Sequence, residues 1–265
     1  MPAWLARRLD ADVALQHADV VFVLCYLLSG LCDSSVFRAW GCFVSMQTGN
    51  TVFLGLGASD AALRKSSKWL KALVSIAAFI AGSGLFALTR WLGPQRRRTL
   101  AGSFAVQAVF LAVAAVLLRT GAISGDTHST TASSTILVVD DGAPDRAVFL
   151  QLVPIALVAF QSAGQMAASR LLGFSEIPTT VLTSLYYDLA ADPALLAPLR
   201  ENVKRNRRFA AAVAVVAGAV LGGWLARATG GIETALWMAA ATKFAVAVAW
   251  LCWPASSKTP PAVSG

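Results

Sequence analysis

Six long runs of hydrophobic residues alternate along the chain with short polar connectors. A helix needs about 20 apolar residues to cross a bilayer, with a usual range of about 17–25. The runs that reach this length are Val20–Phe37, Ala72–Thr89, Thr99–Leu118, Ala147–Ser169, Phe209–Ala226 and Ala235–Trp253. Within them only Asp33 and Lys243 carry charge. This pattern predicts an all-α, polytopic membrane helix bundle of about six spans.

Two further uncharged segments interrupt the pattern. The first, Ala39–Ser59, is apolar at its ends but has a polar centre, Gln47-Thr48-Gly49-Asn50-Thr51. The second, Ile177–Tyr187, has 11 residues, which as a helix would cover about 16 Å, roughly half a bilayer. We expect both segments to be broken or re-entrant. If one or both crossed the membrane, the chain would have seven or eight spans.

The two halves of the chain resemble each other. Ala77–Arg90 aligns with Val213–Arg227, because both place Ala-Gly in mid-span and end in Arg. Thr48-Gly49 then falls on Thr183-Ser184. The predicted organisation is an N-terminal tail (1–17), a first membrane repeat (18–119), an extramembrane Ser/Thr-rich loop (120–146), a second membrane repeat (147–253) and a disordered C-terminal tail (254–265). Three spans per repeat would invert the second copy relative to the first, whereas four would leave the copies parallel.

Charge and composition agree with membrane insertion. The chain is 57% hydrophobic and 14% charged, whereas soluble domains carry about 25% charged residues. The net charge of +8 comes from basic clusters placed between the apolar runs, which is typical of membrane proteins and does not suggest a nucleic-acid partner. Lys and Arg are in excess on the N-terminal side of the predicted spans, which predicts an integral, multi-pass protein with a cytoplasmic N-terminus.

Short motifs follow one another in both halves of the chain. In the first half these are Gly30 with Asp33, then Phe43-Val44-Ser45 and Thr48-Gly49-Asn50. In the second half they are Gln165, Thr179-Thr180, Thr183-Ser184 and Asp188. In this order they resemble the YoaK-like integral membrane protein family (domain of unknown function 1275), with Met166 where the family has Asn and Ser184 where it has Gly. The resemblance implies an integral membrane protein and supplies no biochemical activity.

Asp33 and Lys243 are candidate site residues because a charge inside a span is costly unless it faces protein or water. We expect Lys243 to have a buried partner or a water-filled cavity, with Asp33 the first candidate partner and Asp188 the second. The alternatives are that Asp33 lies near the membrane interface and caps the next segment through Ser34 or Ser35, and that Lys243 forms a static ion pair. The sequence leaves these open.

The polar centres of the two short segments are the candidate substrate-binding residues. In the first, Gly49 permits local unwinding, and backbone groups freed there and the Asn50 amide would bind a polar solute. The alternative is packing of helices through small residues. The predicted substrate-binding residues are Asp33, Gln47, Thr48, Gly49, Asn50, Thr51, Thr179, Thr180, Thr183 and Lys243.

These features predict a small-solute transporter or permease, with a small polar solute bound at mid-membrane and the lipid bilayer as surroundings. The alternative is a non-transporting membrane assembly or interaction protein, whose polar residues would be dry and mutually bonded. We expect no enzyme activity, because no catalytic motif lies in a loop. Cys25, Cys32, Cys42 and Cys252 lack the spacing of a metal site, and we expect neither a metal nor another cofactor.

Overall fold

The computed structural model describes residues 2–121, 123 and 146–256, and in these it is all helical without a strand. Six helices are long and apolar enough to cross a membrane. They are α2 (Asp19–Trp40), α5 (Lys68–Ala87, continued by the 3-10 turn η1, Leu88–Leu92), α6 (Arg97–Arg119), α7 (Arg146–Leu171), α9 (Val203–Thr229) and α10 (Glu233–Cys252). The prediction of a polytopic helix bundle with six spans is therefore confirmed.

The remaining helices are short. They are α1 (Ala3–Asp10), α3 (Gln47–Ser59), α4 (Ala61–Lys65) and α8 (Thr183–Ala190). At 13 and 8 residues, α3 and α8 measure about 20 Å and 12 Å, less than the roughly 30 Å of a bilayer core. Neither is long enough to cross by itself, so the described chain gives no support to eight full-length spans.

Local sequence signals end the long helices. Gly41 follows α2 with a φ of 71°, and its N–H bonds to the carbonyl of Phe37. Gly230 follows α9 with a φ of 76°, and its N–H bonds to the carbonyl of Ala226. Glycine is favoured at both positions because it has no β-carbon and therefore adopts the left-handed conformation without a steric cost. The glycines therefore fix where the chain leaves each helix.

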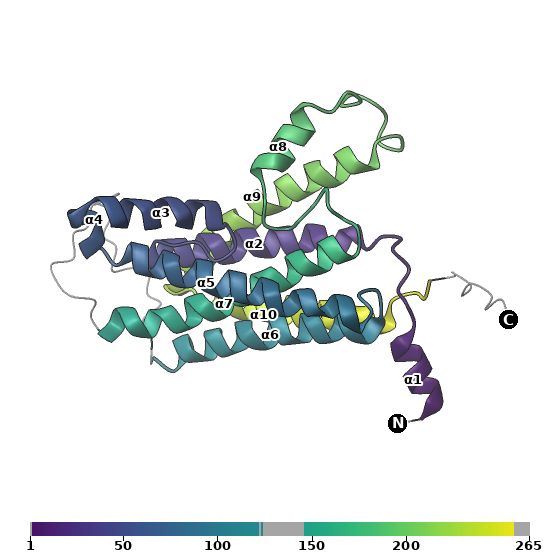
Figure 1. The fold of residues 1–265 in the computed structure, drawn as a ribbon, viewed down its shortest axis with the longest axis horizontal. Helices are drawn as coiled ribbons and strands as arrows, with labels where there is room; N and C mark the ends of the chain where they lie inside the picture. The colour runs from purple at the N-terminus through teal and green to yellow at the C-terminus, as the bar shows by residue number, and fades with distance from the viewer. Residues whose placement is uncertain (1, 122, 124–145, 257–265) are drawn as a thin grey trace.

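The long helices pack mainly as three pairs: α2 with α9, α5 with α7, and α6 with α10 (Figure 1). Each of the three pairs joins a helix from one half of the chain to a helix from the other. In the first two pairs a glycine permits close approach, because a β-carbon at Gly82 would collide with the carbonyl of Phe160 and one at Gly218 with that of Leu27. Small residues at such crossings let helix backbones touch.

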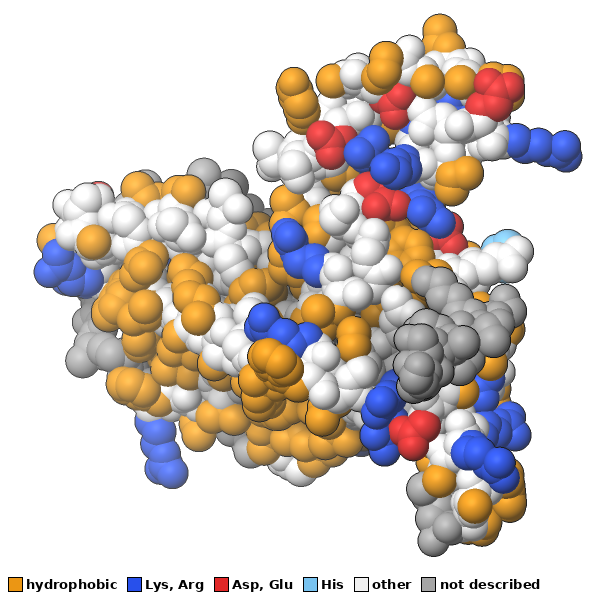
Figure 2. Space-filling model, turned by 45° about the vertical axis from the view of Figure 1, so that its right-hand side comes forward, with side chains coloured by type: hydrophobic (Ala, Val, Ile, Leu, Met, Phe, Trp, Pro, Cys, Tyr) orange, Lys and Arg blue, Asp and Glu red, His pale blue; other side chains and the backbone are white. Residues whose placement is uncertain are grey.

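The two short helices sit differently on the bundle. Figure 1 shows α3 lying along α5, whereas α8 and the beginning of α9 project together from the bundle. In Figure 2 hydrophobic side chains cover much of the helical body, and charged side chains gather on the projecting lobe and near α1. This distribution suits a body surrounded by lipid with ends in water.

The two ends of the described chain meet on one side of the bundle. Val13 forms a bridge with Ala255, and the guanidinium of Arg97 donates to the carbonyls of Arg8 and Trp253. The first residues of the predicted C-terminal tail therefore pair with the N-terminal segment. The rest of that tail, 257–265, and most of the predicted Ser/Thr-rich loop, 124–145, lie outside the described residues.

Candidate solute site between the two short helices

A pocket of about 380 Å³ lies where α3 and α8 begin. Helices α5 and α7 close it with Phe79 and Met166. Its lining residues are Phe43, Ser45, Met46, Gln47, Thr48, Gly49, Phe79, Met166, Thr180, Val181, Leu182 and Thr183. The structure thus brings five predicted substrate-binding residues together, Gln47, Thr48, Gly49, Thr180 and Thr183, from both halves of the chain.

Asn50 fixes the start of α3 and does not line this pocket. Its side chain has no exposed surface. The amide oxygen accepts from the N–H of Phe43 at 2.9 Å, and the amide nitrogen donates to the carbonyl of Phe43 at 2.7 Å and to Ser75 Oγ at 3.1 Å. Thr51 is also outside the pocket, exposed, and bonded to the carbonyl of Gln47. Both predicted site residues therefore have structural contacts.

Thr179 shapes the other side of the pocket through its backbone. Its φ is 64°, a conformation rarely adopted by a β-branched residue. Its carbonyl accepts a bond of 3.0 Å from Ser29 Oγ, and its own buried hydroxyl has no hydrogen-bond partner among the described residues. The next residue, Thr180, lines the pocket and donates to the sulfur of Met166.

Asp33 organises the loop between α2 and α3. Its carboxylate accepts from the N–H groups of Val44 and Ser45, at 2.7 and 2.9 Å, and from the Ser45 hydroxyl. Asp33 is 2% exposed, and it caps the segment before α3 through its own carboxylate, not through Ser34 or Ser35. Because Ser45 lines the pocket, Asp33 positions one wall of the pocket without contacting its space.

Lys243 is buried in α10 with uncharged partners. Its ammonium donates to the side-chain oxygens of Gln107 and Gln165 at 2.7 and 2.5 Å, and to Cys25 Sγ at 3.8 Å. It also lies 5.0 Å from the centre of the Phe104 ring, a favourable cation–π distance. Among the described residues no carboxylate lies within 4 Å of it.

The prediction that Asp33 or Asp188 pairs with Lys243 is therefore wrong, as is that of a static ion pair there. The carboxylate of Asp33 is occupied by the loop before α3. Asp188 lies instead 3.4 Å from the guanidinium of Arg208. The physical reason is that neutral side-chain oxygens accept the hydrogen bonds of the ammonium. A search for opposite charges in the sequence does not find such partners.

A small internal cavity adjoins Lys243. The space open to the centre of a water molecule is about 10 Å³, which is close to what one water needs. Its lining residues are Leu28, Ser29, Cys32, Val44, Ser45, Leu111, Gln161, Ser162, Gln165 and Lys243. The side-chain oxygen of Gln161 is buried without a hydrogen-bond partner in the described chain. A water in this cavity would supply one.

Six polar residues of this region are absent from the predicted site: Ser29, Ser45, Gln107, Gln161, Ser162 and Gln165. Gln165 was noted only as part of a family motif. A signal existed for the three glutamines, since each is an uncharged amide inside an otherwise apolar run. Such amides need hydrogen-bond partners in a bilayer interior, as charged residues do.

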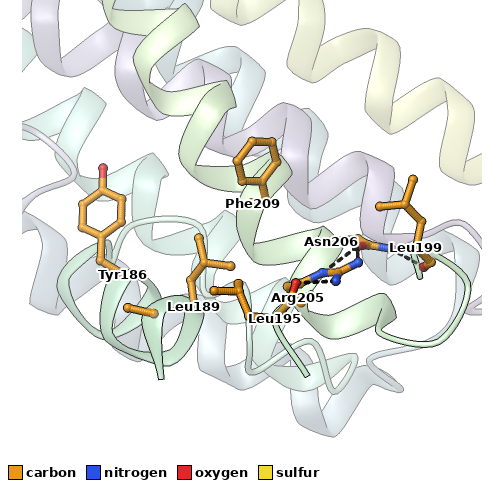
Figure 3. Close-up of a pocket in the computed structure, with 8 residues that line it drawn as sticks. Tyr186, Leu189, Leu195, Leu199, Arg205, Asn206 and Phe209 are labelled. Atoms are coloured by element: carbon orange, nitrogen blue, oxygen red, sulfur yellow. Dashed lines mark hydrogen bonds between the residues drawn. The ribbon is translucent and has the colours of Figure 1, made fainter. Parts of the chain in front are cut away.

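A second pocket of about 480 Å³ separates α8 from the beginning of α9. Figure 3 shows Tyr186, Leu189, Leu195 and Phe209 around it. Arg205 also lines this pocket, and its guanidinium donates to the side chain of Asn206 and to the carbonyls of Leu195 and Ala197. Because Arg205 holds the chain between α8 and α9, we assign it a structural role.

Comparison with known proteins gives one match. A family model described as a protein of unknown function (DUF1275) matches residues 21–249. The chain belongs to this family. The match runs from α2 into α10, so the DUF1275 region includes both short helices and the pocket between them. No curated protein and no solved structure matches the chain.

For this DUF1275 protein, the family match and the six apolar helices together indicate a multi-pass membrane protein. In the described residues no three His, Cys, Asp or Glu side chains gather as metal ligands. The described residues of the central region offer amides, hydroxyls, the thiols of Cys25 and Cys32, and the side chains of Asp33 and Lys243.

Proposed function

We propose that this DUF1275 protein is a small-solute transporter whose solute binds in the pocket between α3 and α8. The observation that carries the proposal is that residues from both short helices, distant in sequence, line one pocket. Many secondary transporters bind their solute where interrupted helices of two repeats meet near mid-membrane. Because fold-level analogy is weak evidence for function, the pocket itself has to be tested.

The lining suggests the class of solute. Among the described residues no charged side chain lines the pocket. Gln47, Thr48 and Thr180 offer amide and hydroxyl groups, and Phe43 and Phe79 offer aromatic faces. The volume of about 380 Å³ is within the range of small-molecule sites, about 300–1,000 Å³. We expect a small solute with both a polar and an apolar part.

The proposal includes an inverted internal repeat, which the pairing of the long helices supports. If α2, α3, α5 and α6 correspond to α7, α8, α9 and α10, the pairing of α2 with α9 is equivalent to that of α7 with α5. The third pairing, of α6 with α10, is its own equivalent. Gly82 and Gly218, 136 residues apart, make the same close approach to carbonyls of Phe160 and Leu27.

Hydrogen bonds around the pocket follow the same correspondence. Ser29 of α2 donates to the carbonyl of Thr179 in the loop before α8, at 3.0 Å. Ser162 of α7, which corresponds to Ser29, donates to the carbonyl of Val44 in the loop before α3, also at 3.0 Å. Each half thus anchors the loop of the other half. Rocking of one repeat against the other would carry these loops with it and alternate access to the pocket.

Thiol labelling tests the proposal. In a chain with Ala in place of its four cysteines, Thr48→Cys and Thr180→Cys would be exposed to a small hydrophilic thiol reagent in native membranes. Leu196→Cys serves as the exposed control and Val220→Cys as the lipid-facing control, since these side chains are 96% and 50% exposed in the structure. We expect Thr48→Cys and Thr180→Cys to react. If both stay unlabelled while Leu196→Cys reacts, the pocket is closed to water and the proposal fails.

One observation favours a second candidate function, a non-transporting assembly protein. Asn50 and Asp33 are fully buried and bonded to neighbouring protein groups, as expected of polar residues that only secure packing. For this candidate we expect labelling to fail at both pocket positions and the protein to purify in a stoichiometric complex.

A further inference from the structure

Two buried charges of opposite sign lie in the bundle without touching. Lys243 is 1% exposed and Asp33 is 2% exposed, and no ion pair within 4 Å joins them in the described chain. An isolated charge in a membrane interior is costly. Direct contact would reduce that cost, so their separation needs another explanation.

The surroundings of Lys243 define its protonation in this arrangement. Three acceptors face its nitrogen: Gln107 of α6, Gln165 of α7 and Cys25 of α2. A lysine ammonium has three N–H donors. The contacts to Gln107 and Gln165 are short, at 2.7 and 2.5 Å, whereas Cys25 Sγ is a weak acceptor at 3.8 Å, so the third N–H is the one that can turn to the cavity that Lys243 lines. Of the other titratable groups on α2, the Cys32 thiol lines the same cavity as Lys243, and Asp33 is the next residue in the sequence. From α6 the Phe104 ring faces the ammonium, and the described residues of α7 that line the cavity, Gln161, Ser162 and Gln165, are not titratable.

The small cavity connects the two charges. Lys243 and Ser45 both line it, and the Ser45 hydroxyl donates directly to the Asp33 carboxylate. The cavity has room for about one water. The unpartnered Gln161 oxygen, buried and also part of the lining, is an acceptor for one of the hydrogens of that water.

We propose that a water in this cavity relays a proton between Lys243 and Asp33. In the forward step an Nζ–H bond of Lys243 breaks and the water oxygen takes the proton. The water releases another proton to Ser45 Oγ, and the Ser45 hydroxyl proton passes to the Asp33 carboxylate. The products are a neutral amine, an unchanged water, an unchanged serine and a carboxylic acid. Both buried charges disappear together and the net charge stays the same.

The relay touches both walls of the solute pocket. At one end Asp33 holds the N–H groups of Val44 and Ser45. At the other end Lys243 bonds to Gln165, whose amide donates to Ser29 at 2.7 Å, and Ser29 donates to the carbonyl of Thr179. Moving the proton therefore changes the hydrogen bonds that secure both loops. Resting on the proposed function, this links the protonation of Lys243 and Asp33 to the two loops that line the solute pocket.

Infrared difference spectroscopy of the purified full-length protein between pH 5 and pH 9 tests the relay. The readout is the carbonyl stretch of a protonated carboxylic acid, assigned to Asp33 by its loss in Asp33→Asn. In Lys243→Met the balancing charge is gone, so we expect the band at pH 7 to grow at least twofold over wild type. An unchanged Asp33 band in Lys243→Met, or its absence from both proteins, overturns the proposal.

A second measurement tests the path. After transfer into D2O we expect the Asp33 band to shift at least tenfold more slowly in Ser45→Ala than in wild type. Ser34→Ala is the matched control, because the Ser34 hydroxyl bonds to the carbonyl of Leu31 in its own helix. Equal rates in wild type and Ser45→Ala, with both proteins folded by circular dichroism, overturn a path through Ser45.

These spectra need no solute, so they fail or succeed independently of the thiol labelling. If the labelling shows a closed pocket while the spectra behave as expected, the relay stands and its coupling to transport is overturned. If the pocket labels and the spectra do not behave as expected, transport stands without this relay.

Discussion

Lys243 and Gln107 occupy the same position, the eleventh residue, in α10 and α6 and are joined by a hydrogen bond of 2.7 Å. In the proposed repeat they are equivalent residues, so their bond lies where the two halves meet. One half contributes a cation and the other an amide oxygen. The departure from symmetry at this contact therefore gives the bundle a buried positive charge whose nearest partners are uncharged.

Replacing Gln165 by Leu should destabilise the protein. The change removes an acceptor from the Lys243 ammonium and leaves Ser29 without its donor. The loss of hydrogen bonds to a buried charge costs about 1.5–3 kcal/mol each. Unfolding in detergent, followed by circular dichroism, would measure the change. Phe244→Leu, on the exposed side of the same helix as Lys243, should alter stability little; an equal loss in both variants would contradict the prediction.

Asn50→Ala should release the start of α3 from α5. The variant removes the bonds to both backbone groups of Phe43 and to Ser75, and buried groups left unpaired cost about 1–3 kcal/mol. We expect a lower midpoint of thermal unfolding and faster hydrogen exchange over residues 43–59. Thr51→Ala is the control, because Thr51 is exposed and bonds within its helix. Unchanged exchange in Asn50→Ala would show that α3 is held by its apolar contacts.

The effect of a glycine substitution on stability should depend on whether the glycine faces another helix. Gly218→Ala places a methyl group against the backbone of Leu27, whereas a β-carbon at Gly223 has open space. Overpacking costs about 1–3 kcal/mol, and replacing an unhindered helix glycine by Ala gains about 0.5–1 kcal/mol. We therefore expect Gly218→Ala to lower the unfolding temperature and Gly223→Ala to preserve or raise it. Equal effects would mean that α2 and α9 do not approach as closely as the structure has them.

Acid should loosen the connection between α8 and α9. The side-chain amide of Asn202 and then the N–H of Ala194 hold the pKa of the Asp192 carboxyl below its usual value. A lowered pKa stabilises the fold above the unfolded-state value of about 3.9. That stability is lost as the pH falls through the folded-state pKa.

A fluorescent probe on Leu196→Cys, at an exposed position in this connection, would follow the change. We expect its anisotropy to fall below about pH 4, the usual range of an Asp carboxyl, and Asp192→Asn to weaken the acid dependence. Asp188→Asn is a control for the other carboxylate beside Arg208. An identical acid transition in Asp192→Asn would assign the titration to another group.

The sequence by itself determined the class of protein and its main elements. Runs of about 20 apolar residues dictate spanning helices, because a bilayer leaves no other partner for backbone groups. An uncharged segment of 11 residues around Thr183, too short to span, and the matching polar centre around Thr48 indicated where the pattern is interrupted. The alignment of Gly82 with Gly218 needed only the spacing of small residues.

Only the tertiary structure decided which polar groups meet. Asp33 and Lys243 attract attention as opposite charges, yet helix packing turns Asp33 toward the backbone of Val44 and Lys243 toward Gln107 and Gln165. Asn50 and Thr48 are two residues apart in one motif, but only Thr48 lines the pocket. The physical reason is that each helix turn divides neighbouring residues between faces, and contacts between helices decide which face is buried.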